Sequence, residues 1–163
     1  MLMTMSLLAG LLTSVLLTGL ILGSLAYNPR LWVGDAPDEM QAAAAPLTRI
    51  ESRMRTAIAV PFFIIILVVP FGALFWYEMN YGALSFWNAF RFLWVTLMTF
   101  NLVDLILIDW LVVVWWQPSW TILKEAEHLY ELNSYTFHFY AFLKGCIGIT
   151  VFTLLAAAVI AFI

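Results

Sequence analysis

Two aspartates, Asp104 and Asp109, lie inside the long apolar run FNLVDLILIDWLVVVWW. A carboxylate near the middle of a membrane helix costs about 2.5–3.5 kcal/mol to insert, so such residues are usually paired or mark a path for protons or ions. On an ideal α-helix Asn101 projects between the two carboxyl groups, and the three side chains share one broad arc. We expect that arc to face other helices or a wet cavity, because lipid would leave these groups without partners.

Lys144 is the basic residue whose depth best matches that of Asp109. Each lies about seven residues from the inner end of its apolar run, which predicts a depth of about 10 Å for both. We therefore predict an ion pair or a water-bridged contact between them; in the alternative, Lys144 extends to the interface. Asp104 is deeper and has no basic partner. We expect it to be neutral and to donate a hydrogen bond to a carbonyl freed by a proline, with a proton or cation site as the alternative.

The remaining polar residues indicate no metal or catalytic centre. His128 and His138 flank the start of the last apolar run, without an HxxxH, HExxH or CxxC spacing, so we predict no metal site. The single Cys146 excludes an internal disulfide. No catalytic residue and no cofactor are assigned, although a bound lipid or pigment would suit so apolar a chain. The candidate functional or structural cluster is Asn101, Asp104, Asp109, Lys144, His138 and Arg30.

Composition places these residues in a membrane protein. The chain is 64% hydrophobic and only 10% charged, which no soluble domain of this length matches. Its net charge of −3 and the lack of a basic patch argue against binding of nucleic acid. Apolar stretches of about 20 residues mark spanning helices. We predict an all-α, polytopic fold in a single membrane domain, residues 1–163, with four transmembrane helices at residues 3–27, 57–77, 87–116 and 138–162.

Basic residues predict the orientation of these spans. Four arginines lie between the first and second spans and one lysine between the third and fourth, whereas neither terminus carries a basic side chain. Because basic loops stay in the cytoplasm, we expect both termini outside and a multi-pass protein of the cytoplasmic (inner) membrane. The first stretch lacks a basic segment and a clear cleavage site, so we predict a helix rather than a signal peptide. The loop residues used here are Arg30, Arg49, Arg53, Arg55 and Lys124.

Local signals predict further features of the first two spans. Thr48 and Glu51 have the spacing of a capping box, which predicts a short amphipathic helix in the first cytoplasmic loop that leads into the second span. Prolines inside that span predict kinks. Gly19 and Gly23 form a GxxxG pattern, which predicts close packing against another helix, and we expect the same of glycines in the last span. The prolines and glycines concerned are Pro61, Pro70, Gly145 and Gly148.

Two segments, YNPRLW and FNLVDLILIDWL, resemble motifs of a family of uncharacterised bacterial four-helix integral membrane proteins. The family pattern is N-P-R-x-W, a proline-containing second span, F-N-L-x-D-L-x-x-x-D-W-L, and a histidine before a glycine-containing last span. The resemblance implies a shared design but no activity. After Pro118 this chain departs from the family, because it has a segment that reads as helical. The matching positions are Asn28, Pro29, Arg30, Trp32, Pro61, Pro70, Gly72, Asn101, Asp104, Asp109, Trp110, His138 and Gly145.

Three functions fit the sequence. The small size and the lack of a catalytic motif favour a non-catalytic accessory or structural subunit, whose partners would be the bilayer and other membrane subunits or further copies of the chain. The first alternative is a small proton- or cation-coupled transporter that uses Asp104 and Asp109. The second alternative is a membrane enzyme acting on a lipid or quinone. It ranks last, because acid and base groups must converge on a substrate and the sequence shows no such convergence.

Overall fold

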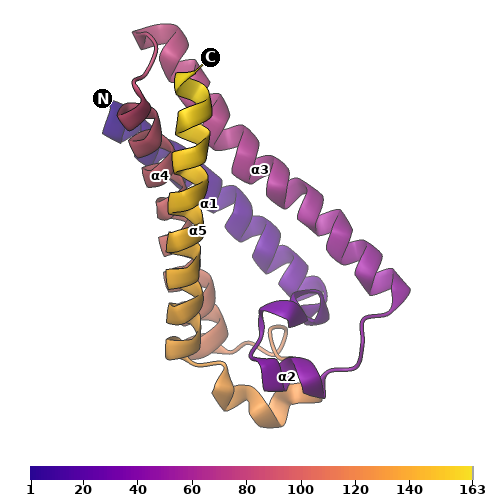
Figure 1. Ribbon diagram of the computed structural model, residues 1–163. Coiled ribbons are helices and arrows are strands. Elements are labelled where there is room, and N and C mark those ends of the chain that lie inside the picture. Colours follow the sequence, from indigo (N-terminus) through magenta and orange to yellow (C-terminus); the bar gives the residue numbers. More distant parts are fainter. Residues whose placement is uncertain (163) are drawn as a thin grey trace.

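The computed structural model describes residues 1–162, and every regular element in that range is a helix. Ile163, the last residue of the predicted domain, lies outside the described residues. The labels α and η distinguish α-helices from 3-10 and π-helices. The elements in chain order are α1 (Leu2–Tyr27), η1 (Pro29–Asp35), α2 (Asp38–Ala43), α3 (Arg49–Tyr81), α4 (Phe86–Val103), η2 (Asp104–Trp116), η3 (Lys124–Leu132) and α5 (Tyr135–Ala161), as Figure 1 shows.

Four helices are long and apolar enough to cross a membrane, which confirms the predicted all-α, four-span fold. The chain is therefore a multi-pass integral membrane protein. The third span combines α4 with η2, and it ends where Gln117 adopts a left-handed conformation with φ 48° before Pro118. Proline cannot continue a helix, so this stop follows from local sequence. The spanning helices are Leu2–Tyr27, Arg49–Tyr81, Phe86–Trp116 and Tyr135–Ala161.

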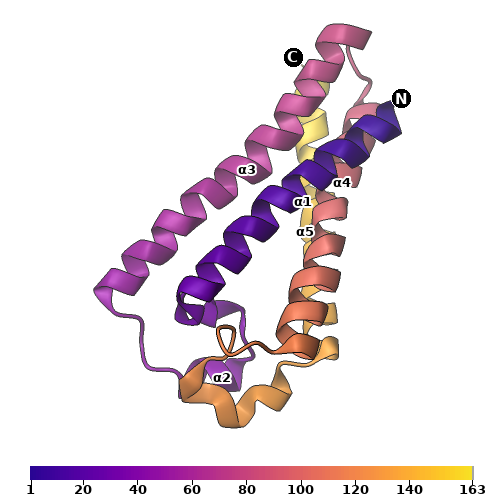
Figure 2. The same cartoon turned by 180° about the vertical axis from the view of Figure 1, so that it is seen from behind.

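The capping box at the start of α3 is present. The Thr48 hydroxyl accepts a hydrogen bond from the Glu51 amide at 3.2 Å, and the Glu51 carboxylate accepts one from the Thr48 amide at 2.8 Å. The segment that follows continues directly into the second span, and the separate short helix of this loop is α2 instead. α3 passes through Pro61 and Pro70 as one long helix, without breaking at either residue (Figures 1 and 2).

The two termini lie at one end of the molecule, and η1, α2 and η3 lie at the other (Figure 1). We refer to these as the terminal end and the loop end. Near the terminal end α3 and α5 meet, where Phe71 and Phe152 pack edge to face with ring centroids 6.2 Å apart. Toward the loop end the pair α1 and α3 diverges from the pair α4 and α5 (Figures 1 and 2). This divergence leaves space inside the membrane-spanning part of the fold.

Glycines bring some of these helices close together. A Cβ added at Gly10 of α1 would lie 2.6 Å from the Thr99 Cβ and 2.8 Å from the Thr96 carbonyl oxygen of α4, so only glycine fits there. A Cβ added at Gly19 or Gly23 would meet nothing within 4 Å. Gly19 and Gly23 therefore make no close contact with another helix within residues 1–162, because the close α1–α4 contact lies nearer the N-terminus and on another face of α1. Packing of the GxxxG pattern against a helix of another subunit stays a prediction.

Candidate functional site

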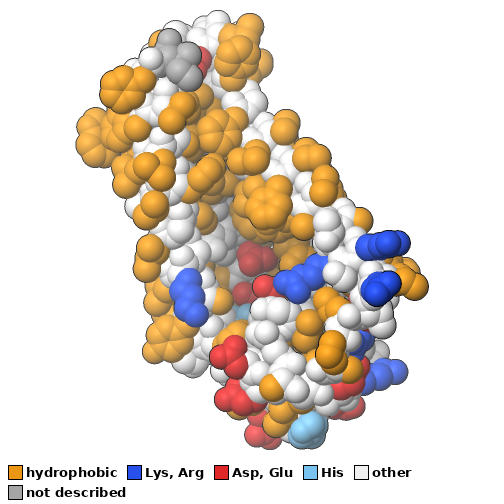
Figure 3. Space-filling view, turned by 45° about the vertical axis from the view of Figure 1, so that its right-hand side comes forward, with side chains coloured by type: hydrophobic (Ala, Val, Ile, Leu, Met, Phe, Trp, Pro, Cys, Tyr) orange, Lys and Arg blue, Asp and Glu red, His pale blue; other side chains and the backbone are white. Residues whose placement is uncertain are grey.

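A cavity of about 530 Å³ occupies the space between the diverging helices at the loop end. Residues of α1 and α3 line one side, residues of α4, η2 and α5 line the other, and η1, α2 and the segment around η3 supply the floor. The floor is held together where Met40 of α2 packs against Leu123 and Ala126. Figure 3 shows the cavity as a hollow between the spanning helices, with acidic side chains inside it.

The cavity lining combines charged and apolar side chains. Asp104 and Asp109 come from the third span, and Asp35 and Asp38 come from the first loop. Two potentially cationic side chains face them from α5. These are His138 and Lys144. The apolar lining includes Ile21, Leu25, Phe62, Phe100, Ile108 and Phe137.

The second half of the third span is a π-helix, which changes where its aspartates point. In η2 a backbone N–H bonds to the carbonyl five residues back, and the Gln117 amide continues this pattern by donating to the Val112 carbonyl at 3.0 Å. This wider winding turns about 82° per residue instead of 100°. Residues five apart are then separated by about 50° around the axis rather than about 140°. The π-helix thus brings Asp104 and Asp109 onto one face, and both line the cavity.

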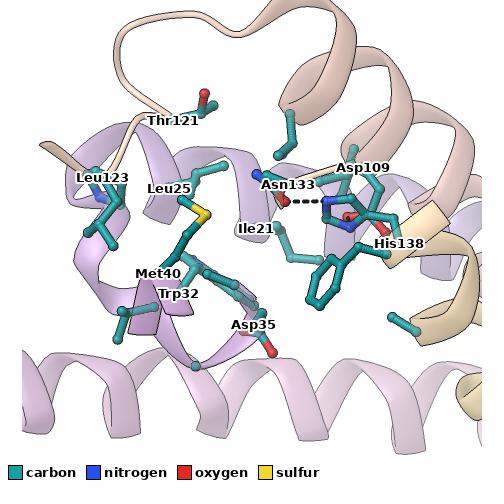
Figure 4. A pocket seen from close by; sticks show the side chains of 18 of the residues that line it. Ile21, Leu25, Trp32, Asp35, Met40, Asp109, Thr121, Leu123, Asn133 and His138 are labelled. Carbon is teal, nitrogen blue, oxygen red and sulfur yellow. Dashed lines mark hydrogen bonds and ion pairs between the residues drawn. The ribbon is translucent and has the colours of Figure 1, made fainter. Parts of the chain in front are cut away.

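His138, in the first turns of α5, is the partner of Asp109. Its Nδ1 lies 3.1 Å from the Asp109 Oδ1, and its Nε2 lies 2.7 Å from the Asn133 Oδ1. Figure 4 shows the imidazole between these two side chains. The His138 side chain is only 8% exposed and that of Asp109 is 21% exposed. Both ring nitrogens therefore have polar partners in a largely enclosed position.

The predicted direct ion pair between Asp109 and Lys144 is not formed within residues 1–162. Lys144 lies six residues beyond His138 on α5, which places it about 9 Å further along the helix axis. Since His138 is level with Asp109, the direct pair is absent because the inner ends of the two apolar runs do not lie at equal depth. The water-bridged contact stays a prediction. Lys144 instead lines the same cavity as an exposed residue.

Asp104 and Asp35 differ in their surroundings. Asp104 is half-buried in the cavity, and no group among residues 1–162 donates a hydrogen bond to its carboxyl group. Its predicted hydrogen bond to a freed carbonyl stays a prediction. Asp35 ends η1, is solvent-exposed, and lines both this cavity and a second hollow beside Arg55. Burial raises the pKa of the Asp35 carboxyl, the nearby Arg55 guanidinium partly offsets this, and repulsion from Asp109 adds to it.

Arg30 and Asn101 of the predicted cluster lie outside the cavity and support it. The Arg30 guanidinium bonds to Glu51 at 2.7 Å, to Glu125, and to the Ala45 carbonyl at 2.9 Å. It thereby fastens the first loop to the start of α3 and to η3. The Asn101 amide donates to the Phe142 carbonyl at 3.3 Å and to the sulfur of Cys146 at 3.5 Å, which joins α4 to α5.

No family model, curated protein or solved structure matches this chain. The resemblance to a four-helix membrane family therefore stays a prediction. Function has to be argued from the cavity itself. Within residues 1–162, no group of three or more His, Cys, Asp or Glu side chains is arranged to hold a metal ion.

The cavity joins some residues that the sequence singled out and adds others that it missed. Four of the six candidate residues line this one cavity, and these are Asp104, Asp109, His138 and Lys144. Asp35, Asp38 and Asn133 were missed, because loop acids and amides usually face solvent. The segment WVGDAPD carried one signal that could have indicated Asp35 and Asp38. A loop that contains Gly and Pro beside a span can fold back against that span.

Proposed function

We propose that this integral membrane protein is a small proton- or cation-coupled carrier in which Asp104 binds the cation and Asp109, held by His138, lies beside it. The observation that carries the proposal is the cavity. It gathers four carboxyl groups against two potentially cationic side chains, Lys144 and His138. Carboxylates at membrane depth are costly, and they persist where they pair or serve an ion pathway. The excess of acidic groups over basic ones favours a positively charged ligand.

The geometry resembles one state of an alternating-access cycle. The cavity opens sideways, on the face between α3 and α5 (Figure 3). The terminal end is closed by a tight cluster in which Phe92 and Leu93 are fully buried and Leu74 is 3% exposed. A carrier needs a second state with this cluster opened. α3 can contribute to that change, because Pro61 and Pro70 each remove a backbone hydrogen bond from it.

Transport in proteoliposomes tests the proposal. Purified protein is reconstituted with an internal pH indicator, and tetramethylammonium, ethylammonium or K⁺ is added outside. We expect pH-dependent flux of at least one cation in the wild type and at least a tenfold loss in Asp104→Asn. The matched control is Glu39→Gln, an exposed acid of α2 that does not line the cavity. Absence of flux in the wild type, or normal flux in Asp104→Asn, contradicts the carboxylate mechanism.

Docking on another membrane subunit is the second candidate function. It is favoured by the α1 face that carries Gly19, Gly23 and Ala26, which is exposed and has open space beside both glycines. Small residues at this spacing let a second helix approach closely. Co-purification in mild detergent of a partner that Gly19→Leu releases supports this role. A lone, homogeneous particle under the same conditions argues against it.

A membrane enzyme is the least supported of the three functions. The one acid–base pair in the cavity is Asp109 and His138, and both imidazole nitrogens already contact protein groups. A general base needs a nitrogen within reach of substrate. Our proposal therefore keeps this pair in a structural role, in which His138 positions η2 against α5.

A further inference from the structure

We propose that the ligand of this cavity is a single-chain amphiphile with an ammonium headgroup, and that it enters from the bilayer through the gap between α3 and α5. This inference rests on the proposed cation-binding function and adds a substrate class and a route. It combines three observations, which are the charge balance, the apolar wall and the lateral opening of the cavity.

The charge balance selects a cationic headgroup. Four aspartates line the cavity against one lysine and one histidine, and the Arg55 guanidinium lies near Asp35, so acidic groups still outnumber basic ones when all three bases are charged. Asp104 receives no hydrogen bond from residues 1–162, which leaves its carboxyl group free for a ligand. An anionic headgroup would be repelled by this excess of acidic side chains. A phosphodiester lipid is disfavoured for the same reason, because its phosphate would lie beside the carboxyl groups.

The apolar wall suits a hydrocarbon tail. Phe62 of α3 and Phe100 of α4 meet edge to face with centroids 6.3 Å apart, and Ile21 of α1 belongs to the same packed cluster. All three side chains also line the cavity. A volume of about 530 Å³ lies in the range of roughly 300–1,000 Å³ that is typical of small-molecule sites. A bare inorganic cation needs neither this volume nor this wall.

The opening between α3 and α5 supplies the route. These helices touch at Phe71 and Phe152 near the terminal end, and at cavity level Figure 3 shows a hollow between them. Two other helix seams carry close contacts. Gly10 allows α1 to pack closely against α4. The Asn101 side chain fills the space beside Gly145 between α4 and α5. Ala141, a small exposed residue of α5, lines the cavity at this opening.

Photolabelling in phosphatidylcholine nanodiscs tests this assignment. The probe is a dodecylamine that carries a diazirine on its tail, and labelled residues are mapped by mass spectrometry. We expect labels on Phe62, Phe100 or Ile21. Excess decyltrimethylammonium should abolish the labelling, whereas decyl sulfate should not, although both partition into the bilayer. Asp104→Asn should weaken the competition at least tenfold, and Glu39→Gln should leave it unchanged.

The competitors separate this inference from the proposed function. If ethyltrimethylammonium competes as well as the decyl compound, cation binding stands and the amphiphile assignment is overturned. Equal competition by decyl sulfate overturns both. Equal competition by phosphatidylethanolamine added to the nanodiscs overturns the single-chain assignment in favour of a membrane lipid.

The route has its own test, which does not depend on the folding of an Asp104 variant. Ala141→Trp should narrow the opening and reduce labelling at least fivefold. The matched control is Leu143→Trp, at an exposed residue of the same helix that does not line the cavity. Equal labelling of the two tryptophan variants overturns entry between α3 and α5.

Discussion

The contact between Asp109 and His138 explains how one charge is tolerated inside the membrane-spanning region. The imidazole bridges the carboxylate to Asn133, so three polar groups from η2, the loop before α5 and α5 itself satisfy one another. A buried polar network stabilises a fold only when its members are paired. Asp104 lacks such a network among residues 1–162, which is why the proposed carrier function gives the ligand contact to Asp104 rather than to Asp109.

A double-mutant cycle checks the partner of Asp109. Free energies of unfolding are measured in detergent for Asp109→Asn, His138→Gln and the double variant. Because the two side chains are in contact, we expect their effects to be non-additive by about 0.5–3 kcal/mol. The control cycle pairs Asp109→Asn with Lys144→Gln, whose effects should add within about 0.5 kcal/mol. Additive effects for Asp109 with His138, together with non-additive effects for Asp109 with Lys144, would show that Lys144 is the partner.

At the scale of elements, the π-helix η2 and the contact between α1 and α4 have different structural roles. η2 turns two aspartates toward one cavity at the cost of regular α-helical hydrogen bonding. Part of that cost is offset where the Tyr130 hydroxyl donates to the Val113 carbonyl at 2.9 Å. The α1–α4 seam instead holds the helices rigidly, and the Thr96 hydroxyl adds a hydrogen bond to the Ser6 carbonyl at 3.1 Å.

Two glycine substitutions on α1 measure the tightness of that seam. Gly10→Ala places a methyl group against Thr99 and the Thr96 backbone, and overpacking of this kind costs about 1–3 kcal/mol. Gly19→Ala points into open space and should leave thermal stability in detergent unchanged or slightly raised. Equal loss of stability in both variants would show that the open face of α1 is covered by another copy or subunit.

At the scale of the whole molecule, the fold is tightly packed toward the terminal end and hollow toward the loop end. The terminal end is packed by buried apolar side chains, and the loop end is a cavity with a floor of short helices. Arg30 joins three parts of that floor through Glu51, Glu125 and the Ala45 carbonyl. The cavity therefore depends on loops that the basic residues predict to lie in the cytoplasm.

Cysteine labelling in intact cells tests this orientation. In a Cys146→Ser background, Met79→Cys marks the terminal end and Glu39→Cys marks the loop end, and both positions are exposed. We expect a membrane-impermeant maleimide to label Met79→Cys in intact cells and Glu39→Cys only after permeabilisation. Labelling in the opposite order would invert the topology and place the cavity on the outer side.

The number of spans, the capping box at Thr48 and the polar residues of the third span were readable from the sequence. Each depends on residues close together in the chain, because hydrophobicity over about 20 residues decides insertion and a cap needs only a neighbouring side chain. The same local logic placed the end of the third span before Pro118.

The cavity itself was decided only by the tertiary structure. Asp109 meets His138 across 29 positions of the chain, and Asp35 reaches the same space from another loop. Both depend on how far helices diverge and at what depth each begins, which is set by contacts between distant segments. The winding of η2 also escaped prediction, since its apolar residues suit an α-helix equally well. The sequence alone determined which acids lie within the third span, and the packing determined which of them is paired with His138.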